Sequence, residues 1–127
     1  MLEHEIQNKI RLKISAERLA TIFRANVGEG YAGEEIIKNA DGSITIKRPR
    51  RFKTGLPTGF PDLFGLKSIT ITPDMVGRKI AVFAFIEVKQ PKKKPTKVQE
   101  NMIDFLLNNG AIGGVAHSDD EAAEKLR

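Results

Sequence analysis

Hydrophobic residues near the start of the chain recur every four positions, which places them on one face of an α-helix. This pattern predicts a helix over residues 2–15. A second apolar stretch, residues 19–27, is rich in β-branched side chains and predicts a strand. Residues 79–88 are apolar at successive positions, which indicates a strand buried on both faces and therefore central in its sheet. The helical stripe consists of Leu2, Ile6, Ile10 and Ile14.

Helix-capping signals divide the last third of the chain. Thr96 stands where an N-cap would and predicts a helix over residues 97–109, which the following glycine ends. Residues 111–117 predict a short strand. Ser118, with Glu121 three residues later, is typical of a capping box that opens a terminal helix.

The middle of the chain has weaker patterns. Glycines break up residues 28–57, which we interpret as an excursion from the core with one strand running into a basic loop. Residues 59–66 predict a loop that enters a short strand, and residues 72–77 predict a turn. The order of these elements indicates a mixed α/β fold with one central sheet, in a single domain spanning residues 1–127.

The composition is that of an ordinary globular protein. The chain has 127 residues, 40% of them apolar and 29% charged, which suits one core. The absence of cysteine excludes disulfides and thiolate metal sites, and it fits a reducing cytoplasm. Frequent charges near the start predict no signal peptide, and no apolar run is long enough to span a bilayer.

Basic residues gather in two short runs. The net charge is +5, and nine of the 21 lysines and arginines lie in these runs. Such clusters suit a polyanion, because each neutralised phosphate releases counterions. The alternative is that both runs are solvated loops. The first run consists of Lys47, Arg48, Arg50, Arg51 and Lys53, and the second of Lys92, Lys93, Lys94 and Lys97.

Two carboxylates and a lysine stand at strand ends. Asp62 lies where the 59–66 loop enters its strand, and Glu87 and Lys89 share one face at the end of the 79–88 strand. If the two strands are neighbours, the carboxylates converge and repel unless a cation lies between them. A hard ion with oxygen ligands, Mg²⁺ or Mn²⁺, fits, and Lys89 could orient a water beside it. The alternative is an ordinary charge pair, with Asp62 a turn residue.

The same residues occur in a characteristic order. "GFPDL" is followed by "FIEVK" and then by "QENMIDFLLNNGAIGGVAHSDDEA". This set resembles a VRR-NUC domain of the PD-(D/E)XK nuclease superfamily, in its small stand-alone phage-type form. The superfamily signature corresponds to Pro61-Asp62 and to Glu87-Val88-Lys89. The two prolines of "QPKKKPTKV" depart from the family pattern and affect the conformation of that loop.

The resemblance extends to two helices. The glutamine that the family carries after the lysine corresponds to Gln99. The E-x-x-I-Q pattern of its first helix corresponds to Glu3, Ile6 and Gln7. Helical geometry puts Glu3 about 40° and Glu5 about 120° from the centre of the apolar stripe. Glu3 is therefore expected on the core face and Glu5 in water, the alternative being a frayed N-terminus with Glu3 exposed.

The resemblance implies a restriction-endonuclease-like core and a metal-dependent DNA endonuclease. Mg²⁺ or Mn²⁺ would bind Asp62, Glu87 and the Val88 carbonyl, with Glu3 closing the site directly or through water. Lys89 would orient the attacking water. The catalytic residues implied in this way are Glu3, Asp62, Glu87, Lys89 and Gln99.

The resemblance also implies partners. Both basic runs would hold backbone phosphates. Stand-alone members resemble Holliday-junction resolvases in action, so we expect branched DNA as the substrate and, because a junction has two symmetric scissile sites, a homodimer. A phage-encoded member would act in the host cytoplasm. His117 stands where many relatives carry an arginine. The alternative function is a basic DNA-binding module without catalysis.

Overall fold

The computed structural model describes residues 2–26 and 28–127, so Val27, the last residue of the strand predicted over 19–27, lies outside the described residues. The chain divides into two compact units. One consists of Met1–Thr21 with Gly65–Arg127, and the other of Ile22–Phe64.

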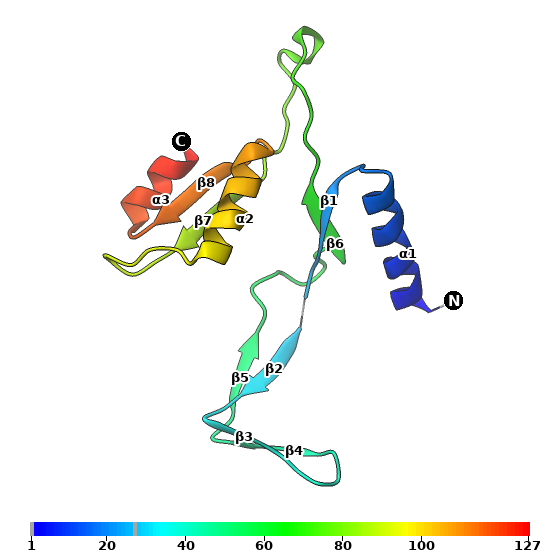
Figure 1. Ribbon diagram of the computed structural model, residues 1–127, viewed down its shortest axis with the longest axis vertical. Helices are drawn as coiled ribbons and strands as arrows, with labels where there is room; N and C mark the ends of the chain where they lie inside the picture. Colours follow the sequence, from blue (N-terminus) through cyan, green and yellow to red (C-terminus); the bar gives the residue numbers. More distant parts are fainter. Residues whose placement is uncertain (1, 27) are drawn as a thin grey trace. The chain divides into compact units, whose positions relative to one another are not determined.

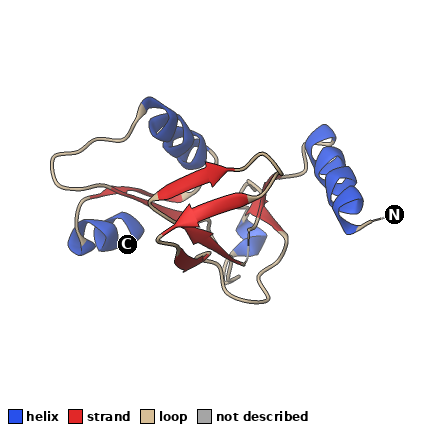
Figure 2. Ribbon diagram, turned by 90° about the horizontal axis from the view of Figure 1, so that it is seen from below, coloured by secondary structure: helices blue, strands red, loops and turns tan. Residues whose placement is uncertain are grey.

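The elements follow the predicted order with additional strands in the middle of the chain (Figures 1 and 2). Within the described ranges, none of the helices combines the length and apolarity needed to cross a membrane. The helices are α1 (Glu3–Ala16), α2 (Lys97–Asn108) and α3 (Asp119–Leu126), with a 3₁₀ turn at Pro73–Met75. The strands are β1 (Thr21–Arg24), β2 (Glu29–Ala32), β3 (Glu35–Lys38), β4 (Ile44–Lys47), β5 (Arg50–Lys53), β6 (Leu63–Leu66), β7 (Ala84–Val88) and β8 (Ile112–Ala116).

The strands pair as four two-stranded sheets, β1 with β6, β2 with β5, β3 with β4 and β7 with β8. The mixed α/β class is confirmed, but the prediction of one central sheet is wrong for this structure. Apolar runs identify strands, whereas partners are fixed by the connections between them. The connection over residues 67–83 is far longer than a hairpin loop, so the sequence alone does not dictate that β7 pairs with β6.

The β7–β8 pair and its helices form the best-packed part of the first unit. The strands run parallel, with Ala84 opposite Ile112 and Val88 opposite Ala116, and α2 is the crossover that parallel pairing requires. Both α2 and α3 pack against β8. Leu106 on α2 and Ala116 on β8 are the buried hydrophobic residues among those described, at 7% and 2% exposure.

A close approach between these two strands depends on one glycine. A Cβ atom on Gly113 would lie 1.9 Å from the carbonyl oxygen of Phe85, the residue opposite it. The φ of Gly113 is 143°, which also favours glycine. The first glycine of the "GG" in the predicted strand over 111–117 is therefore required by strand pairing.

The strand predicted over 79–88 is shorter and less central than expected. Only Ala84–Val88 is a strand, and its sheet contains β8 alone as a neighbour. Ile80 and Val82, within the predicted range, are 43% and 46% exposed. Continuous apolarity thus located the strand correctly but overstated its length and its number of neighbours.

Capping residues define the helix ends much as the sequence predicts. Thr96 and Gln99 form a full capping box at the start of α2. Gly110, with a φ of 93°, follows its end. At α3 the Ser118 hydroxyl accepts from the N–H of Glu121, as predicted. The other half of that box is wrong, because the Glu121 carboxylate bonds to the residue before Ser118, as described below.

Helix α1 confirms the prediction over 2–15 but not its packing. No described residue of α1 is buried, and Ile6 and Ile10 of its apolar stripe are 44% and 42% exposed. Glu3 and Glu5 are both exposed. The expectation that Glu3 lies on a buried face is therefore wrong here, since the stripe that defined this face is itself exposed.

The second unit contains a two-part β ribbon, which we define as strands β2 to β5. Glu29 pairs with Lys53 and Ala32 with Arg50 in its first part, and Glu35 pairs with Lys47 in its second, all antiparallel. The sequence indicated one strand and a basic loop here. The basic segment is instead half of a ladder, because β2 and β3, which the glycines obscured, supply its partners.

Candidate functional site

The end of β7 brings Glu87 and Lys89 together. Side chains alternate along a strand, so both lie on one face, and the Lys89 nitrogen Nζ is 3.5 Å from Oε1 of Glu87. The side chains of Glu87 and Lys89 are 30% and 20% exposed, so both are partly withdrawn from water. The N–H of Lys89 donates to the Ala116 carbonyl at 3.0 Å, which extends the contact with β8 beyond the last paired residues.

The residue between them has the opposite environment. Val88 is 76% exposed, so at this point the strand presents an apolar side chain to water and keeps two charged ones partly covered. This reverses the usual preference of apolar and charged side chains. Two partly covered charged side chains on a rigid strand are typical of a binding or catalytic site. The 3.5 Å distance between Lys89 Nζ and Glu87 Oε1 is also that of an ordinary ion pair.

Asp62 belongs to the other unit, directly before β6. Its side chain is exposed, and its backbone is held because its carbonyl accepts the N–H of Ala25 at 2.9 Å. Phe64 anchors this segment through ring contacts with Phe23 and Phe60, with centroid distances of 5.8 and 5.4 Å. Because Asp62 and Glu87 lie in different units, their convergence stays a prediction.

The possible metal ligands can be compared only within each of the two units. Over residues 2–26 and 28–127, no three His, Cys, Asp or Glu side chains form a group that could hold a metal ion. Within the first unit, the oxygen donors at the end of β7 are the Glu87 carboxylate and the Val88 carbonyl. These are hard oxygen donors of the kind that Mg²⁺ and Mn²⁺ prefer.

The two glutamates of α1 differ in their local bonds. The Glu5 carboxylate accepts the N–H of Leu2 at 2.8 Å, so Glu5 caps the helix. Glu3 is exposed in the first turn, and its contribution to a metal site stays a prediction.

Gln99 has a structural role as well as a predicted catalytic one. Its side-chain oxygen accepts the N–H of Thr96 at 3.0 Å, and its own N–H donates to the Thr96 hydroxyl at 3.2 Å. The capping bonds use the oxygen of Gln99, so its amide nitrogen is the atom that could donate to a phosphate or a water.

The first basic run lies on the β ribbon and is largely neutralised there. Four of its five side chains form ion pairs with glutamates in β2, in β3 and at the position directly before β3. In the two ladders Glu29 stands opposite Lys53 and Glu35 opposite Lys47. The run therefore offers less free positive charge than its composition indicates. The pairs join Lys47 to Glu35, Arg48 to Glu34, and both Arg51 and Lys53 to Glu29.

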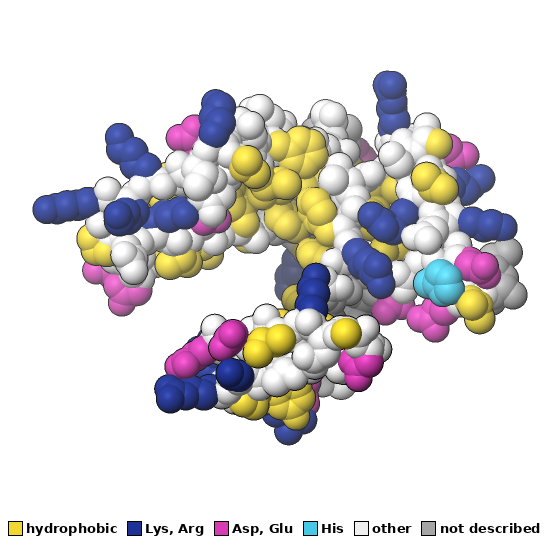
Figure 3. All heavy atoms as spheres, turned by 60° about the horizontal axis from the view of Figure 1, so that its bottom comes forward, with side chains coloured by type: hydrophobic (Ala, Val, Ile, Leu, Met, Phe, Trp, Pro, Cys, Tyr) yellow, Lys and Arg dark blue, Asp and Glu magenta, His cyan; other side chains and the backbone are white. Residues whose placement is uncertain are grey.

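The second basic run lies between β7 and α2, and we call residues 90–95 the lysine loop. Lys92, Lys93 and Lys94 are exposed, and none of them takes part in an ion pair among the described residues. Lys97, at the start of α2, lies 4.0 Å from Glu100. Lysine and arginine side chains project outward over the face seen in Figure 3. The loop begins directly after Lys89, so its charges follow the Glu87–Lys89 pair along the chain.

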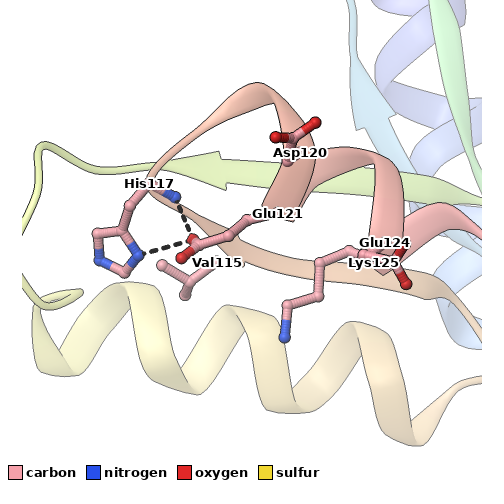
Figure 4. A pocket seen from close by; sticks show the side chains of 6 residues that line it. All are labelled: Val115, His117, Asp120, Glu121, Glu124 and Lys125. Carbon is pink, nitrogen blue, oxygen red and sulfur yellow. Dashed lines mark hydrogen bonds and ion pairs between the residues drawn. The ribbon is translucent and has the colours of Figure 1, made fainter.

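His117 connects the lysine loop to the start of α3. Its Nε2 lies 2.8 Å from the Lys93 carbonyl oxygen, and its Nδ1 lies 3.0 Å from the Glu121 carboxylate (Figure 4). The same carboxylate accepts the backbone N–H of His117 at 2.6 Å. The bond to the Lys93 carbonyl and then the bond to Glu121 raise the pKa of His117, and the His117 bonds lower the pKa of Glu121. The i,i+4 spacing of His117 and Glu121 is visible in the sequence, but the capping-box pattern assigns Glu121 a different partner.

The comparisons with known proteins define the class of this chain. A family model described as the VRR-NUC domain matches residues 3–120, nearly the whole chain. The chain therefore belongs to the VRR-NUC domain family, which implies a nuclease-type function with DNA as its partner. No curated protein and no solved structure matches the chain.

Proposed function

We propose that this VRR-NUC protein is a metal-dependent endodeoxyribonuclease with a PD-(D/E)XK core that hydrolyses phosphodiester bonds in branched DNA. The observation that carries the proposal is the Glu87–Lys89 pair, partly covered at the end of β7 while the intervening Val88 is exposed. A carboxylate and an ammonium held on one face of a rigid strand are suited to binding a cation and orienting a water beside it.

The residues available fit a magnesium or manganese ion. Glu87 and the Val88 carbonyl would hold it together with Asp62, and Glu3 would contribute directly or through water. When bound, such an ion acts as a Lewis acid and lowers the pKa of the attacking water. Lys89, already within 3.5 Å of Glu87, would orient that water and offset negative charge developing on the phosphate.

The lysine loop supports DNA as the substrate. Its three exposed lysines begin three residues after Lys89, so a DNA backbone held by the loop would pass close to the charged end of β7. Gln99, fixed by its capping box at the start of α2, would donate its amide N–H to a phosphate or to the water. The β ribbon would contribute through Arg50, the basic residue of its run outside the ion pairs described above.

Branched DNA and a homodimer are the finer parts of the proposal. A four-way junction presents two symmetry-related scissile bonds, and a two-fold symmetric pair of subunits would place one site at each. Sedimentation of the free protein and of its junction complex measures this directly. A single subunit per junction at saturation would contradict the dimer.

A second function follows from the same geometry. Because the Glu87 and Lys89 charges already satisfy each other, the chain could be a DNA-binding module in which the pair is structural. This alternative predicts DNA binding that depends on the lysine loop and no strand cleavage with any divalent ion.

A cleavage panel separates the two functions. Linear, flapped and four-way DNA of shared sequence would be incubated with wild type and with Asp62→Asn, in Mg²⁺, Mn²⁺ or EDTA. We expect metal-dependent cleavage of the four-way substrate by wild type, and loss of cleavage with retained binding in the variant. Asp74→Asn, an exposed aspartate in the 3₁₀ turn, is the matched control. Binding without cleavage of any substrate would favour the non-catalytic module.

A further inference from the structure

The contact of His117 with the lysine loop has an unusual chemical requirement. Both partners of the imidazole, the Lys93 carbonyl and the Glu121 carboxylate, are hydrogen-bond acceptors, at 2.8 and 3.0 Å from its two nitrogens. A neutral imidazole has one N–H, whereas the imidazolium has two. Only the protonated ring can therefore donate to both partners and tie the loop to α3.

The loop needs support of this kind because its own conformation is strained. The N–H of Lys93 donates to the Gln90 carbonyl at 3.0 Å, closing a turn with Pro91 and Lys92 at its centre. Lys92 has a φ of 67°, a left-handed value that favours glycine. The His117 bond to the carbonyl of Lys93 holds the residue that follows this strained position.

We propose that His117 is a positioning residue for DNA binding: it holds the lysine loop in the shape that presents Lys92, Lys93 and Lys94 to backbone phosphates. The proposal rests on the proposed function for its ligand. It adds to that function a residue outside the predicted catalytic set and a dependence of DNA binding on the protonation of His117.

The charges around His117 determine the direction of the pH effect. Glu121 on α3 favours the protonated ring, while Lys125 on α3, the loop lysines and Lys89 at the end of β7 are cationic. Asp120 points away from the His117–Glu121 pair, and Glu124 lies further along α3 (Figure 4). The pKa of His117 is raised. Both hydrogen bonds of the ring, to the Lys93 carbonyl and to the Glu121 carboxylate, are therefore complete below the ordinary histidine pKa of about 6.5, and one of them is lost as the pH rises through the raised pKa. The pKa of Glu121 is lowered, so its carboxylate remains ionised across that range.

The test is equilibrium binding of a fluorescent four-way junction in EDTA, by anisotropy, from about pH 5.5 to about pH 8.5, on either side of the ordinary histidine pKa. Wild-type affinity should fall with rising pH by at least about eightfold at 0.1 M salt, the effect of one lost phosphate contact. The slope of log K against log salt should become shallower by at least about 0.9.

Three variants test whether the pH dependence comes from His117. His117→Ala should bind at all pH values with the weak affinity of wild type at high pH. His117→Arg should bind tightly at all pH values, because a guanidinium can donate to both acceptors and does not titrate. His4→Ala, which removes the other histidine of the chain from the exposed α1 helix, should follow wild type.

Each outcome decides the proposal. A pH-independent wild type, a His117→Ala variant with wild-type pH dependence, or a His117→Arg variant that still weakens at high pH would each overturn it. If His117→Ala fails to fold by circular dichroism, His117→Arg carries the test alone. Metal-dependent cleavage with a flat binding profile would overturn only this inference, whereas no binding by wild type at any pH would overturn the proposed function with it.

Discussion

The two basic runs are predicted to differ in their contribution to DNA binding, although the sequence makes them look alike. Lys92, Lys93 and Lys94 are exposed and outside the ion pairs of the described residues, whereas Arg48, Arg51 and Lys53 are paired with glutamates. A cation paired with a glutamate presents little net charge to a phosphate and would have to give up that partner to contact one. It therefore neutralises DNA less and releases fewer of the counterions condensed on the DNA. Two triple variants to glutamine, one in each group, remove the same net charge and serve as each other's control.

The size of the difference follows from counting contacts. Each phosphate contact contributes about 0.9 to the slope of log K against log salt, so the lysine-loop variant should flatten the slope by up to about 2.7. The ribbon variant should flatten it by less than about 0.9. Anisotropy titrations of a duplex and a four-way junction at four or more salt concentrations, in EDTA, give both slopes.

The reasoning fails if the two variants flatten the slope equally, or if the ribbon variant has the larger effect. Either result would mean that the ribbon exchanges its glutamate partners for phosphates when DNA binds. Circular dichroism spectra of both variants would show that neither result reflects unfolding. An Arg50→Gln variant, removing the remaining basic residue of the ribbon run, should flatten the slope by about 0.9 if that residue meets a phosphate.

Two further predictions concern activity and stability. Glu3→Gln should strongly lower the cleavage rate and change the unfolding free energy by less than about 0.5 kcal/mol, since Glu3 is exposed. Glu5→Ala, which removes the oxygen that accepts the Leu2 N–H, should cost about 0.5–1 kcal/mol of stability and leave cleavage near wild type. Single-turnover rates and urea melts measure both, and the reverse pattern would contradict the assignment of Glu3. Gly113→Ala should destabilise by more than about 3 kcal/mol or prevent folding, because its methyl would lie 1.9 Å from the Phe85 oxygen, while Gly55→Ala, with open space around it, should change the melting midpoint little. Equal midpoints for the two alanine variants would refute the close approach of β7 and β8.

Local structure could be predicted from the sequence where neighbouring residues determine it. Thr96 and Gln99 are three residues apart, and their capping box needs only α2 itself. The strand content of residues 112–116 likewise follows from a short apolar run. By contrast, strand partners depend on contacts between distant segments, so the single central sheet and the buried face of α1 could not be inferred reliably from periodicity.

In the candidate site, too, the features that depend on neighbouring residues could be predicted, and those that depend on distant contacts could not. The spacing of Glu87 and Lys89 places both on one face of any strand, and the structure adds that the pair is partly covered while Val88 is exposed. The ribbon ion pairs and the bond from His117 to the Lys93 carbonyl involve residues far apart in the chain, and they required coordinates. Side-chain types and spacing predict chemistry, whereas charge compensation is a property of the folded pairing.

The most direct test of the nuclease proposal is the single-turnover cleavage rate of a four-way junction at saturating Mg²⁺ for Glu87→Gln. The amide keeps the shape of the side chain and removes its charge. Mutating a residue that hydrogen-bonds to a metal ligand lowers activity by up to about a hundredfold, and loss of a direct ligand should lower the cleavage rate at least as much. Glu100→Gln, which alters another glutamate paired with a lysine, is the matched control and should cleave like wild type. The account predicts at least about a hundredfold slower cleavage for Glu87→Gln with junction affinity equal to or tighter than wild type. A cleavage rate close to wild type in that variant would contradict the assignment of Glu87 and, with it, the proposed active site.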